Sequence, residues 1–277
     1  MLNKIIKNFL ISRYIVDFIN FFLIRILKAK KILSSAVTFQ GKYFSVLDSD
    51  IFIVSYPKSG NMWLSLIVAN LFNRKNFVNI SNINKYVQDI YLTKESYIAS
   101  RKSPRIFKSH DTFDVRFKKV IYIVRDPRDI ITSSYFFLIR IGKIKINYSK
   151  RKFVKNFLNG DYEVDFGSWH QNVGSWYGAR NKNIFFVKYE NLKKNSYKEI
   201  KSIADFLNIK VSNKLIKKIE KNTNFSKQKN FEDKINIKKI NYFRKGEVNQ
   251  WKPFLSREQN RIIKVKWAHY MKKFNYI

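Results

Sequence analysis

The sequence predicts an α/β fold in which a single parallel β-sheet is flanked by helices. Three short apolar runs each lead into a segment with helical periodicity, in residues 51–71, 120–139 and 184–207. Strands that helices cover on both faces read as continuous apolar runs. Strands that alternate with helices form parallel sheets with right-handed crossovers. At 277 residues and 45% hydrophobic content, the chain can bury one large core.

The first 35 residues have a different pattern from the rest of the chain. We expect residues 1–35 to be an amphipathic helical segment and residues 36–277 to be the globular domain. The apolar stretch in residues 2–27 is interrupted by charges, so no run reaches the ~20 apolar residues of a membrane span. No cleavage site of small residues follows it, which argues against a signal peptide. Two interpretations stay open: an interfacial helix on an anionic bilayer, or a helix packed on the domain.

Composition excludes some function classes. The chain has no cysteine, which excludes disulfides, thiolate zinc sites and cysteine nucleophiles and fits a reducing compartment. We therefore expect a cytoplasmic protein. Peripheral contact with the inner membrane surface through residues 1–27 is the expectation only under the first of the two interpretations, the interfacial helix. The net charge of +35 would attract polyanions, but the lysines are spread along the whole chain. No base-reading module appears, so no specific nucleic-acid partner is expected.

The segment from Ile51 to Leu71 predicts an anion-binding strand–loop–helix, as in P-loop nucleotide-binding folds. The strand Ile51–Val54 ends at Tyr56-Pro57, a polar turn follows, and apolar residues then recur at helical spacing from Trp63. The helix N-terminus and Lys58 would both favour an anion in that turn. Lys58 precedes the only glycine, unlike the lysine of the G-x-x-x-x-G-K-[ST] loop, which disfavours a nucleotide-dependent kinase. An ordinary turn capped by Ser59 is the simpler alternative.

The next segments predict two more strands that end in polar side chains. Residues 73–103 are polar and suggest loops and a short helix beside a cleft. Arg105–His110 then indicates a strand that carries Lys108 and His110 to its end, where ligands of open parallel sheets bind. Val120–Val124 is a buried strand followed by a helix with Asp126 as its cap and Pro127 at its first position.

In this second unit, Arg125 would stand at the strand end and Ser133 two turns into the helix. Pairing of Arg125 with Asp126 or Asp129 is the structural alternative to a ligand-binding role.

The rest of the chain predicts one more strand–helix unit and two C-terminal segments. A helix contains Trp169, Val173 and Trp176, the strand Ile184–Lys188 follows, and Lys198–Leu207 is an amphipathic helix. Residues 222–242 are charged and low in aliphatic residues, so we expect a mobile loop. The final helix, residues 256–273, begins at the capping residue Ser256.

Four motifs in this order resemble those of the sulfotransferases that use 3′-phosphoadenosine 5′-phosphosulfate (PAPS), over most of the chain from Ile51. YPKSGNMW is similar to the loop that binds the 5′-phosphosulfate, and VRDPRDIITSSY to the segment that binds the 3′-phosphate. KSH resembles the motif with the catalytic histidine, and FRKG the second 3′-phosphate loop. The resemblance implies sulfuryl transfer from PAPS to a hydroxyl or amine acceptor, with PAP as product and no metal.

The resemblance also implies a role for each matching residue. His110 would be the base, with Lys58 and Lys108 beside it in the catalytic set. The 5′-phosphate side would be bound by Lys58, Ser59, Gly60, Asn61 and the backbone N–H of Met62. The adenine would lie against Trp63, Tyr189, Thr223 and Phe225. The 3′-phosphate would be held by Arg125, Ser133, Arg244, Lys245 and Gly246.

Two departures from the family pattern concern the ligands. Asn61 and Met62 stand where two threonines are common, which removes a hydroxyl donor to the cofactor. Asp111-Thr112 replaces the frequent Leu-Pro after the histidine, so the acceptor side of the cleft should differ. Acceptor pockets are built by loops, here residues 79–103, 141–168 and 222–242, whose sequences carry no general code. A small molecule, a glycan or a lipid-linked hydroxyl are all candidate acceptors, and the oligomeric state is not indicated.

Two hypotheses of other kinds remain beside the sulfotransferase. One is a nucleotide-dependent kinase of related fold, and the other is a basic protein that binds nucleic acid or membrane. The second explains the net charge but not the four ordered motifs.

Overall fold

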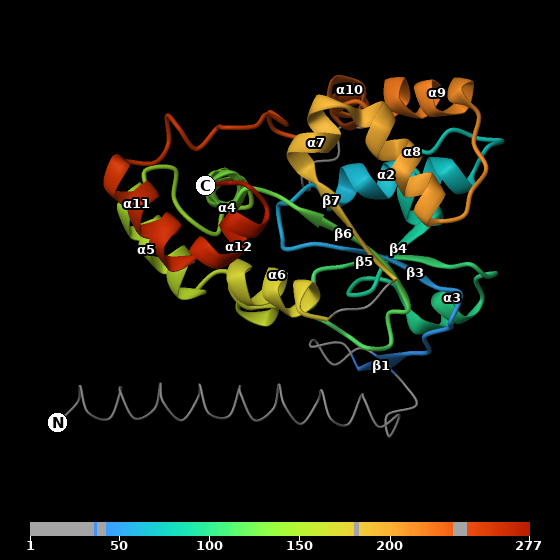
Figure 1. The fold of residues 1–277 in the computed structure, drawn as a ribbon, viewed down its shortest axis with the longest axis horizontal. Helices are drawn as coiled ribbons and strands as arrows, with labels where there is room; N and C mark the ends of the chain where they lie inside the picture. Colours follow the sequence, from blue (N-terminus) through green and yellow to red (C-terminus); the bar gives the residue numbers. More distant parts are fainter. Residues whose placement is uncertain (1–35, 38–42, 180–182, 235–242) are drawn as a thin grey trace.

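A five-stranded parallel sheet forms the centre of the protein (Figure 1). The computed structural model describes residues 36–37, 43–179, 183–234 and 243–277. The strand order is β4–β5–β3–β6–β7, and every neighbouring pair is parallel, which confirms the predicted fold class. The strands are β3 (Ile51–Val54), β4 (Val87–Asp89), β5 (Ile106–Ser109), β6 (Lys119–Val124) and β7 (Ile184–Lys188). A two-residue antiparallel ladder joins β1 (Ala36–Val37) to β2 (Tyr43–Phe44).

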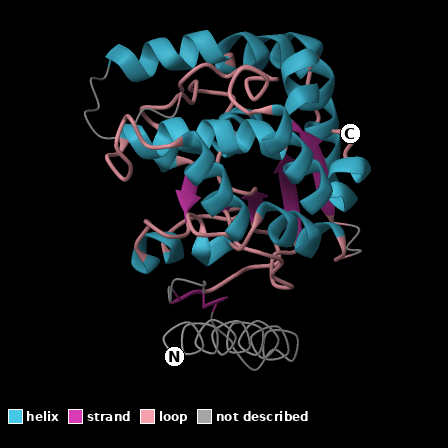
Figure 2. Cartoon of the chain, turned by 90° about the vertical axis from the view of Figure 1, so that its left-hand side faces the viewer, coloured by secondary structure: helices cyan, strands magenta, loops and turns pink. Residues whose placement is uncertain are grey.

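Helices cover both faces of this sheet (Figure 2). The first group consists of α2 (Asn61–Phe72), α7 (Tyr189–Lys194), α8 (Ser196–Phe206), α9 (Asn213–Thr223) and α10 (Phe225–Lys234). The second group consists of α4 (Pro127–Arg140), α5 (Lys150–Asn159), α6 (Trp169–Tyr177), α11 (Arg257–Lys266) and α12 (Ala268–Lys273). Short elements are η1 (Ile83–Lys85), α3 (Glu95–Ala99) and η2 (Val164–Phe166). Within the described ranges, no helix is both long and apolar enough to cross a membrane.

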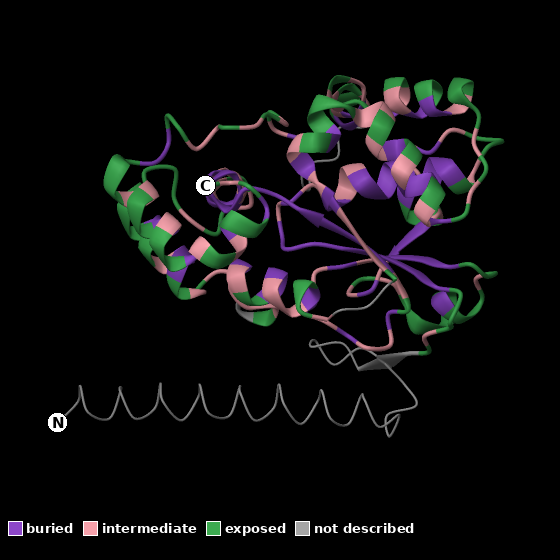
Figure 3. Ribbon diagram, in the orientation of Figure 1, coloured by how far each residue is buried: buried purple, intermediate pink, exposed green. Residues whose placement is uncertain are grey.

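Each central strand contributes side chains to both layers of the core. Along β3, Phe52 and Val54 join the cluster that contains α4, α5 and α6, whereas Ile51 and Ile53 join the cluster with α2 and α8. All four side chains are buried, and so are most residues of β5 and β6, whereas β7 at the edge of the sheet is buried only at Val187 (Figure 3). The ring of Phe52 stacks on that of Phe117 at a centroid distance of 3.7 Å. This two-sided burial is why β3 reads as an unbroken apolar run.

The strand order places a topological switch point beside β3. After β3 the chain builds β4 and β5 on one side of it, and then β6 and β7 on the other. In open parallel sheets, ligands bind beyond the carboxyl ends of the strands at such a point. The loops after β3, β5, β6 and β7 therefore border one crevice.

The predicted strands are present, but two predictions about the C-terminal half were wrong. The segment 222–242, expected to be a mobile loop, contains the end of α9 and the helix α10; residues 235–242 lie outside the described residues. Helix α10 buries polar instead of aliphatic residues: Gln228 accepts the backbone N–H of Ile80 at 3.1 Å, and Glu232 accepts that of Phe243 at 3.1 Å. Apolar periodicity cannot detect a helix that is held in this way.

The final helix was expected to be continuous over residues 256–273. It is two helices, α11 and α12, because the chain breaks at Trp267, which is buried with φ −119° and ψ 20°. Its start was predicted correctly, since Ser256 and Gln259 form a capping box. The predicted N-terminal helix of residues 1–35 lies outside the described residues.

Candidate active site

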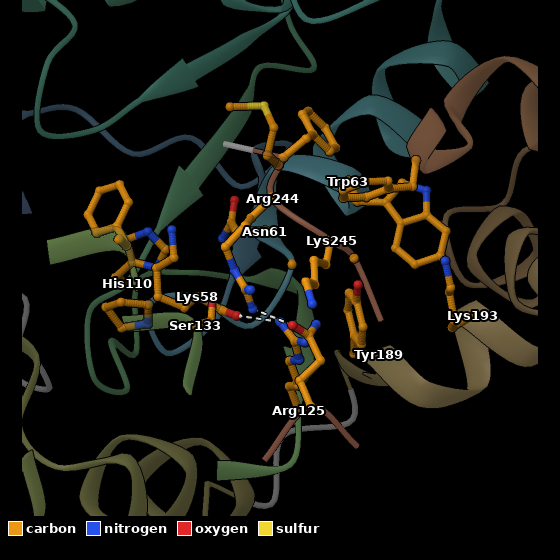
Figure 4. A pocket seen from close by; sticks show the side chains of 18 of the residues that line it. Lys58, Asn61, Trp63, His110, Arg125, Ser133, Tyr189, Lys193, Arg244 and Lys245 are labelled. Carbon is orange, nitrogen blue, oxygen red and sulfur yellow. Dashed lines mark hydrogen bonds between the residues drawn. The ribbon is translucent and has the colours of Figure 1, made fainter. Parts of the chain in front are cut away.

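A cavity of about 310 Å³ lies beyond the carboxyl ends of the strands. All the residues that the sequence motifs single out line this cavity, except Ser59 and Thr223 (Figure 4). They come from the β3–α2 loop, the ends of β5 and β6, helices α4, α7 and α10, and the segment 243–250. Residues up to 188 positions apart in the chain, such as Lys58 and Gly246, thus converge on one site.

The β3–α2 loop is shaped by two residues in the left-handed region of the backbone. Lys58 has φ +67° and Gly60 has φ +103°. A Cβ on Gly60 would lie 2.7 Å from the Tyr189 ring, so only glycine fits there. Helix α2 begins directly after this glycine, and its first N–H groups have no partner within the helix. These N–H groups and the helix dipole favour an anion in the loop.

Asn61 and Ser59 were both expected to face a ligand, but the Asn61 side chain points into the protein and the Ser59 hydroxyl is buried. The Asn61 amide donates to the carbonyls of Ile53 and Ser109 and to the Ser55 hydroxyl, at 3.2–3.3 Å. Its side chain therefore ties the loop to the ends of β3 and β5, and only its backbone N–H can serve an anion. The Ser59 hydroxyl is buried and has no hydrogen-bond partner in the described part of the chain.

Lys58 extends over an aromatic ring inside the cavity. Its Nζ lies 3.6 Å from the centroid of the Phe137 ring, a cation–π contact. Burial lowers the pKa of Lys58 to about 8, and the nearby Arg140 also lowers it, whereas Glu163 raises it. Burial and the neighbouring cations thus disfavour the charged form of Lys58. An anion bound beside its ammonium would stabilise that form.

Arg125 connects four segments at the end of β6. Its Nη1 donates to the carbonyl of Lys58 at 3.2 Å and its Nη2 to that of Glu247 at 2.9 Å. Its guanidinium lies 4.2 Å from the centroid of the Tyr189 ring. The carboxylate of Asp126 pairs with Arg128, and that of Asp129 accepts the backbone N–H groups of Asn249 and Trp251, so in the described residues neither forms the ion pair with Arg125 that the structural alternative supposed. Its buried Nε–H has no partner in the described residues, which leaves a donor available.

The segment 243–250 lies against this group. Gly246 has φ +65°, and a Cβ there would lie 2.1 Å from the Phe225 ring. The Arg244 guanidinium stacks 4.4 Å from the Phe136 centroid and donates to Gln250. Burial lowers the pKa of Arg244, and Arg125 and Arg140 lower it further. Arg244, Lys245 and Arg125 therefore form a cluster of cations, with Ser133 of α4 also lining the cavity (Figure 4).

An aromatic slot lies at the other end of the loop. Trp63 meets the ring of Tyr189 edge to face at 5.6 Å, and Phe225 meets Phe243 at 5.4 Å. Thr223, which the motif comparison assigned to this pocket, is buried and donates to the carbonyl of Ile219 at 2.9 Å, so it lies outside the slot. Lys193 of α7 lines the slot instead. A planar ring would fit between such side chains.

His110 is fixed at three atoms. Its backbone N–H donates to the Tyr91 hydroxyl at 2.7 Å, and its carbonyl accepts from the Asn172 amide at 2.8 Å. Its Nδ1 lies 2.8 Å from the carbonyl of Ser55. A carbonyl can only accept, so Nδ1 carries the proton and Nε2 keeps a free lone pair. Burial lowers the pKa of His110 to about 4, which keeps the ring neutral and able to accept a proton.

Lys108 and the acceptor side complete the cavity. Lys108 forms an ion pair with Asp89 of β4 at 2.9 Å. Phe137, Glu163 and Phe166 line the cavity as well, and no motif in the sequence indicated these three residues individually. Glu163 and Phe166 do fall in residues 141–168, one of the loops expected to build the acceptor pocket. In the described ranges, no cluster of three or more His, Asp or Glu side chains is arranged to hold a metal.

One cavity thus holds an aromatic slot, Lys58 in the loop before α2, the cation cluster of Arg125, Arg244 and Lys245, and His110. Comparison with known proteins identifies the family of the chain. A profile of the sulfotransferase domain matches residues 48–275.

Individual relatives agree with this profile. The chain is 30% identical to bovine sulfotransferase 1E1, over 83% of this chain and 85% of that protein. It is 27% identical to rabbit amine sulfotransferase, over 83% of each chain. Mouse sulfotransferase SULT7A1 complexed with PAP has 27% identity and a TM-score of 0.68, covering 84% of this chain and 93% of that one.

Proposed function

This chain belongs to the sulfotransferase domain family, and we propose that it transfers a sulfuryl group from PAPS to the hydroxyl or amine of an acceptor, with His110 as the base. The family assignment supports sulfuryl transfer itself. The observation that supports the detailed proposal is the position of His110: its Nδ1 faces the carbonyl of Ser55 at 2.8 Å, and it lines the same cavity as the Lys58 loop and the Arg125 cluster.

We assign the ligand-binding residues from the geometry of the cavity. Lys58 and the backbone N–H groups of the loop would bind the 5′-phosphate, and Arg125, Ser133, Arg244 and Lys245 the 3′-phosphate. Trp63, Tyr189 and Phe225 would enclose the adenine. The unpartnered Ser59 hydroxyl and Arg125 Nε support this assignment, because buried polar atoms without partners are rare in folded proteins.

PAPS supplies the activated sulfuryl group and leaves as PAP. His110 Nε2 takes the proton of the acceptor hydroxyl as the acceptor oxygen forms its bond to sulfur. Lys58 and the N-terminus of α2 stabilise the electron pair that the bridging oxygen keeps when its bond to sulfur breaks. Positioning and charge stabilisation are the main requirements of such a transfer, as in phosphoryl transfer. No step assigned here uses a metal.

We propose a small-molecule acceptor, because aromatic side chains border the space beside His110: the Phe166 ring lies 5.6 Å from the His110 ring, and Phe137 lines the same cavity. The relatives include a rabbit amine sulfotransferase, whose name specifies an amine acceptor. A glycan or a lipid-linked hydroxyl is the alternative class if residues 1–27 hold the protein at the inner membrane surface. The absence of cysteine from the sequence supports a cytoplasmic location.

Two measurements test this proposal. We expect PAP to bind in preference to ATP and in the presence of competing DNA, as measured by titration calorimetry. We also expect transfer of labelled sulfate from PAPS to members of a panel of phenols, alcohols and amines. Binding of ATP in preference to PAP would favour the kinase alternative. Displacement of PAP by competing DNA would favour a protein that binds nucleic acid.

A further inference from the structure

Asn61, the first residue of α2, has a buried side chain that lies between the ends of β3 and β5. The carbonyls of Ile53 and Ser109 can only accept hydrogen bonds, so the amide nitrogen points toward them, at 3.2 and 3.3 Å. The Ser55 hydroxyl is a third acceptor at 3.2 Å, and the amide oxygen accepts from Ser65 at 3.3 Å. The amide thus has partners at both its nitrogen and its oxygen.

Two of these partners hold His110. The Nδ1–H of His110 donates to the carbonyl of Ser55 at 2.8 Å, and the Ser55 hydroxyl oxygen lies 3.2 Å from the same nitrogen. Ser109 directly precedes the histidine, and its carbonyl also accepts the backbone N–H of Ser55 at 3.2 Å. Asn61 therefore contacts both the residue that binds the histidine ring and the residue next to it in the chain.

These contacts decide which nitrogen of the His110 ring keeps a lone pair. In a neutral histidine the tautomer is set by the hydrogen bonds of the ring. If the Ser55 carbonyl moved away, the proton could pass to Nε2, which would then have no lone pair for the acceptor hydroxyl. A shift of the end of β3 relative to β5 would separate the two groups. The Asn61 amide spans this junction, because it donates to both strands or their ends.

We propose that Asn61 is a positioning residue for His110 and connects the nucleotide loop to the base. Its amide holds the ends of β3 and β5 so that Nδ1 keeps its proton and Nε2 its lone pair, while its backbone N–H stays available to the 5′-phosphate. This inference rests on the proposed function. Because the amide acts on the side of the base alone, its loss should slow turnover without weakening nucleotide binding.

Asn61→Thr removes the amide, keeps the backbone N–H and adds a hydroxyl that could face the nucleotide. With 2-naphthol as the phenol of the acceptor panel, we expect kcat to fall 10- to 100-fold and the acceptor KM to change less than threefold. PAP affinity, measured by calorimetry, should stay equal or rise. Asn70→Thr is the control, because Asn70 is a second buried amide on α2 that donates to the carbonyls of Leu66 and Val78 and does not line the cavity. Its kcat and PAP affinity should stay within threefold of the wild type.

Ser55→Ala tests the same network from β3. It removes the hydroxyl that receives the Asn61 amide and keeps the carbonyl that binds Nδ1. We expect a smaller fall in kcat, three- to tenfold, with PAP affinity unchanged. Because both changes act on one network, the double variant should lose little more than Asn61→Thr alone. Losses that multiply would make the two effects independent and overturn the inference.

The tautomer of His110 is a readout that needs no acceptor. Nitrogen NMR of the PAP-saturated protein distinguishes the two tautomers, and the signals missing from His110→Ala identify the ring. We expect the Nδ1–H form in at least tenfold excess in the wild type and in Asn70→Thr. Asn61→Thr should lower this ratio at least threefold, and an unchanged ratio would contradict the role of Asn61.

Turnover of Asn61→Thr within threefold of the wild type, or equal falls in turnover and PAP affinity, would also overturn the inference. If thermal unfolding shows that Asn61→Thr does not fold, Ser55→Ala decides: a kcat and a tautomer ratio within twofold of the wild type contradict the role. If the wild type does not use 2-naphthol, the tautomer ratios decide. Failure of the wild type to bind PAP would instead contradict the proposed function.

Discussion

The carboxylate of Asp129 accepts the backbone N–H of Asn249 at 2.8 Å and thereby connects helix α4 to the segment that carries Arg244 and Gly246. Its other oxygen accepts the N–H of Trp251 at 3.0 Å. Burial raises the pKa of Asp129, while Arg125 and these two N–H groups lower it. Asp129 is not among the residues that line the cavity, so it is a positioning residue for the cation cluster.

Replacing Asp129 tests this link. Asp129→Asn keeps the shape but offers one acceptor oxygen to two N–H groups. We expect PAP to bind 10- to 100-fold more weakly, because the segment with Arg244 and Lys245 is no longer held in place against α4. Binding of AMP, which lacks the 3′-phosphate, should change less. Calorimetry with both nucleotides measures this. Asp205→Asn, at an exposed site on α8, is the control, and equal weakening of PAP and AMP would contradict the link.

His110→Ala should remove most turnover without weakening PAP. A well-placed general base contributes ~10²–10⁴-fold to rate, and its proton comes from the acceptor, so the nucleotide contacts remain. Turnover with labelled PAPS and PAP titration are compared in the same preparation. If the variant keeps turnover within a few-fold of the wild type, another group is the base.

The titration of His110 gives a separate prediction. Because burial lowers its pKa to about 4, His110 in the free protein should stay neutral as the pH falls through 6.5, the ordinary value for histidine. Between these two values the unfolded chain takes up a proton that the folded protein does not, so stability should decrease as the pH falls. The sequence has three histidines, so the NMR signal missing from His110→Ala identifies this ring. A midpoint near 6.5 would contradict its burial.

The sequence predicted the fold because its strands are buried on both faces. Ile51–Val54 and Val120–Val124 are apolar at every position, and each is followed by turn and cap residues that end the strand. Helix α10 could not be predicted in this way, since its buried residues Gln228 and Glu232 are polar and accept backbone N–H groups from outside the helix, those of Ile80 and Phe243.

The residues of the candidate site likewise fall into those that the sequence predicts and those that it does not. Arg125 and His110 each follow a strand directly, and Lys58 lies in the loop after β3, so the parallel sheet itself brings them to one edge. Lys193 and Glu163 reach the cavity from elements whose position depends on tertiary packing, and nothing in their local sequence indicates it. Thr223 shows the opposite case: the family resemblance assigned it to the adenine pocket, but its buried hydroxyl donates to the carbonyl of Ile219 and it does not line the cavity.

Removing residues 1–31 tests the membrane interpretation of the N-terminal segment, which lies outside the described residues. If that segment is an interfacial helix, the truncated protein should co-sediment less with vesicles of anionic lipid, because it has lost the apolar face and several cations. PAP affinity should not change. A truncated protein that becomes insoluble yet still binds vesicles would indicate that the segment packs on the domain.

Arg125 gives the most discriminating prediction, because PAP and AMP differ only in the 3′-phosphate that it is proposed to bind. Loss of a guanidinium–phosphate contact in a partly enclosed site costs ~2–4 kcal/mol. Arg125→Ala should therefore weaken PAP by one to three orders of magnitude, at ~1.4 kcal/mol per tenfold, and Ser133→Ala by less. AMP binding should hardly change, because AMP never uses the contact.

Arg125 also donates to the carbonyls of Lys58 and Glu247, so its loss has a second route to weaker binding. That route loosens the 5′-phosphate loop and would weaken PAP and AMP together. The dissociation constant of AMP divided by that of PAP, measured in wild type, Arg125→Ala and Ser133→Ala, therefore separates the two roles. If this ratio falls toward one in Arg125→Ala, Arg125 is assigned to the 3′-phosphate. An unchanged ratio with both nucleotides weakened would make Arg125 a structural connector, and a wild type without preference for PAP would remove the cofactor argument for PAPS.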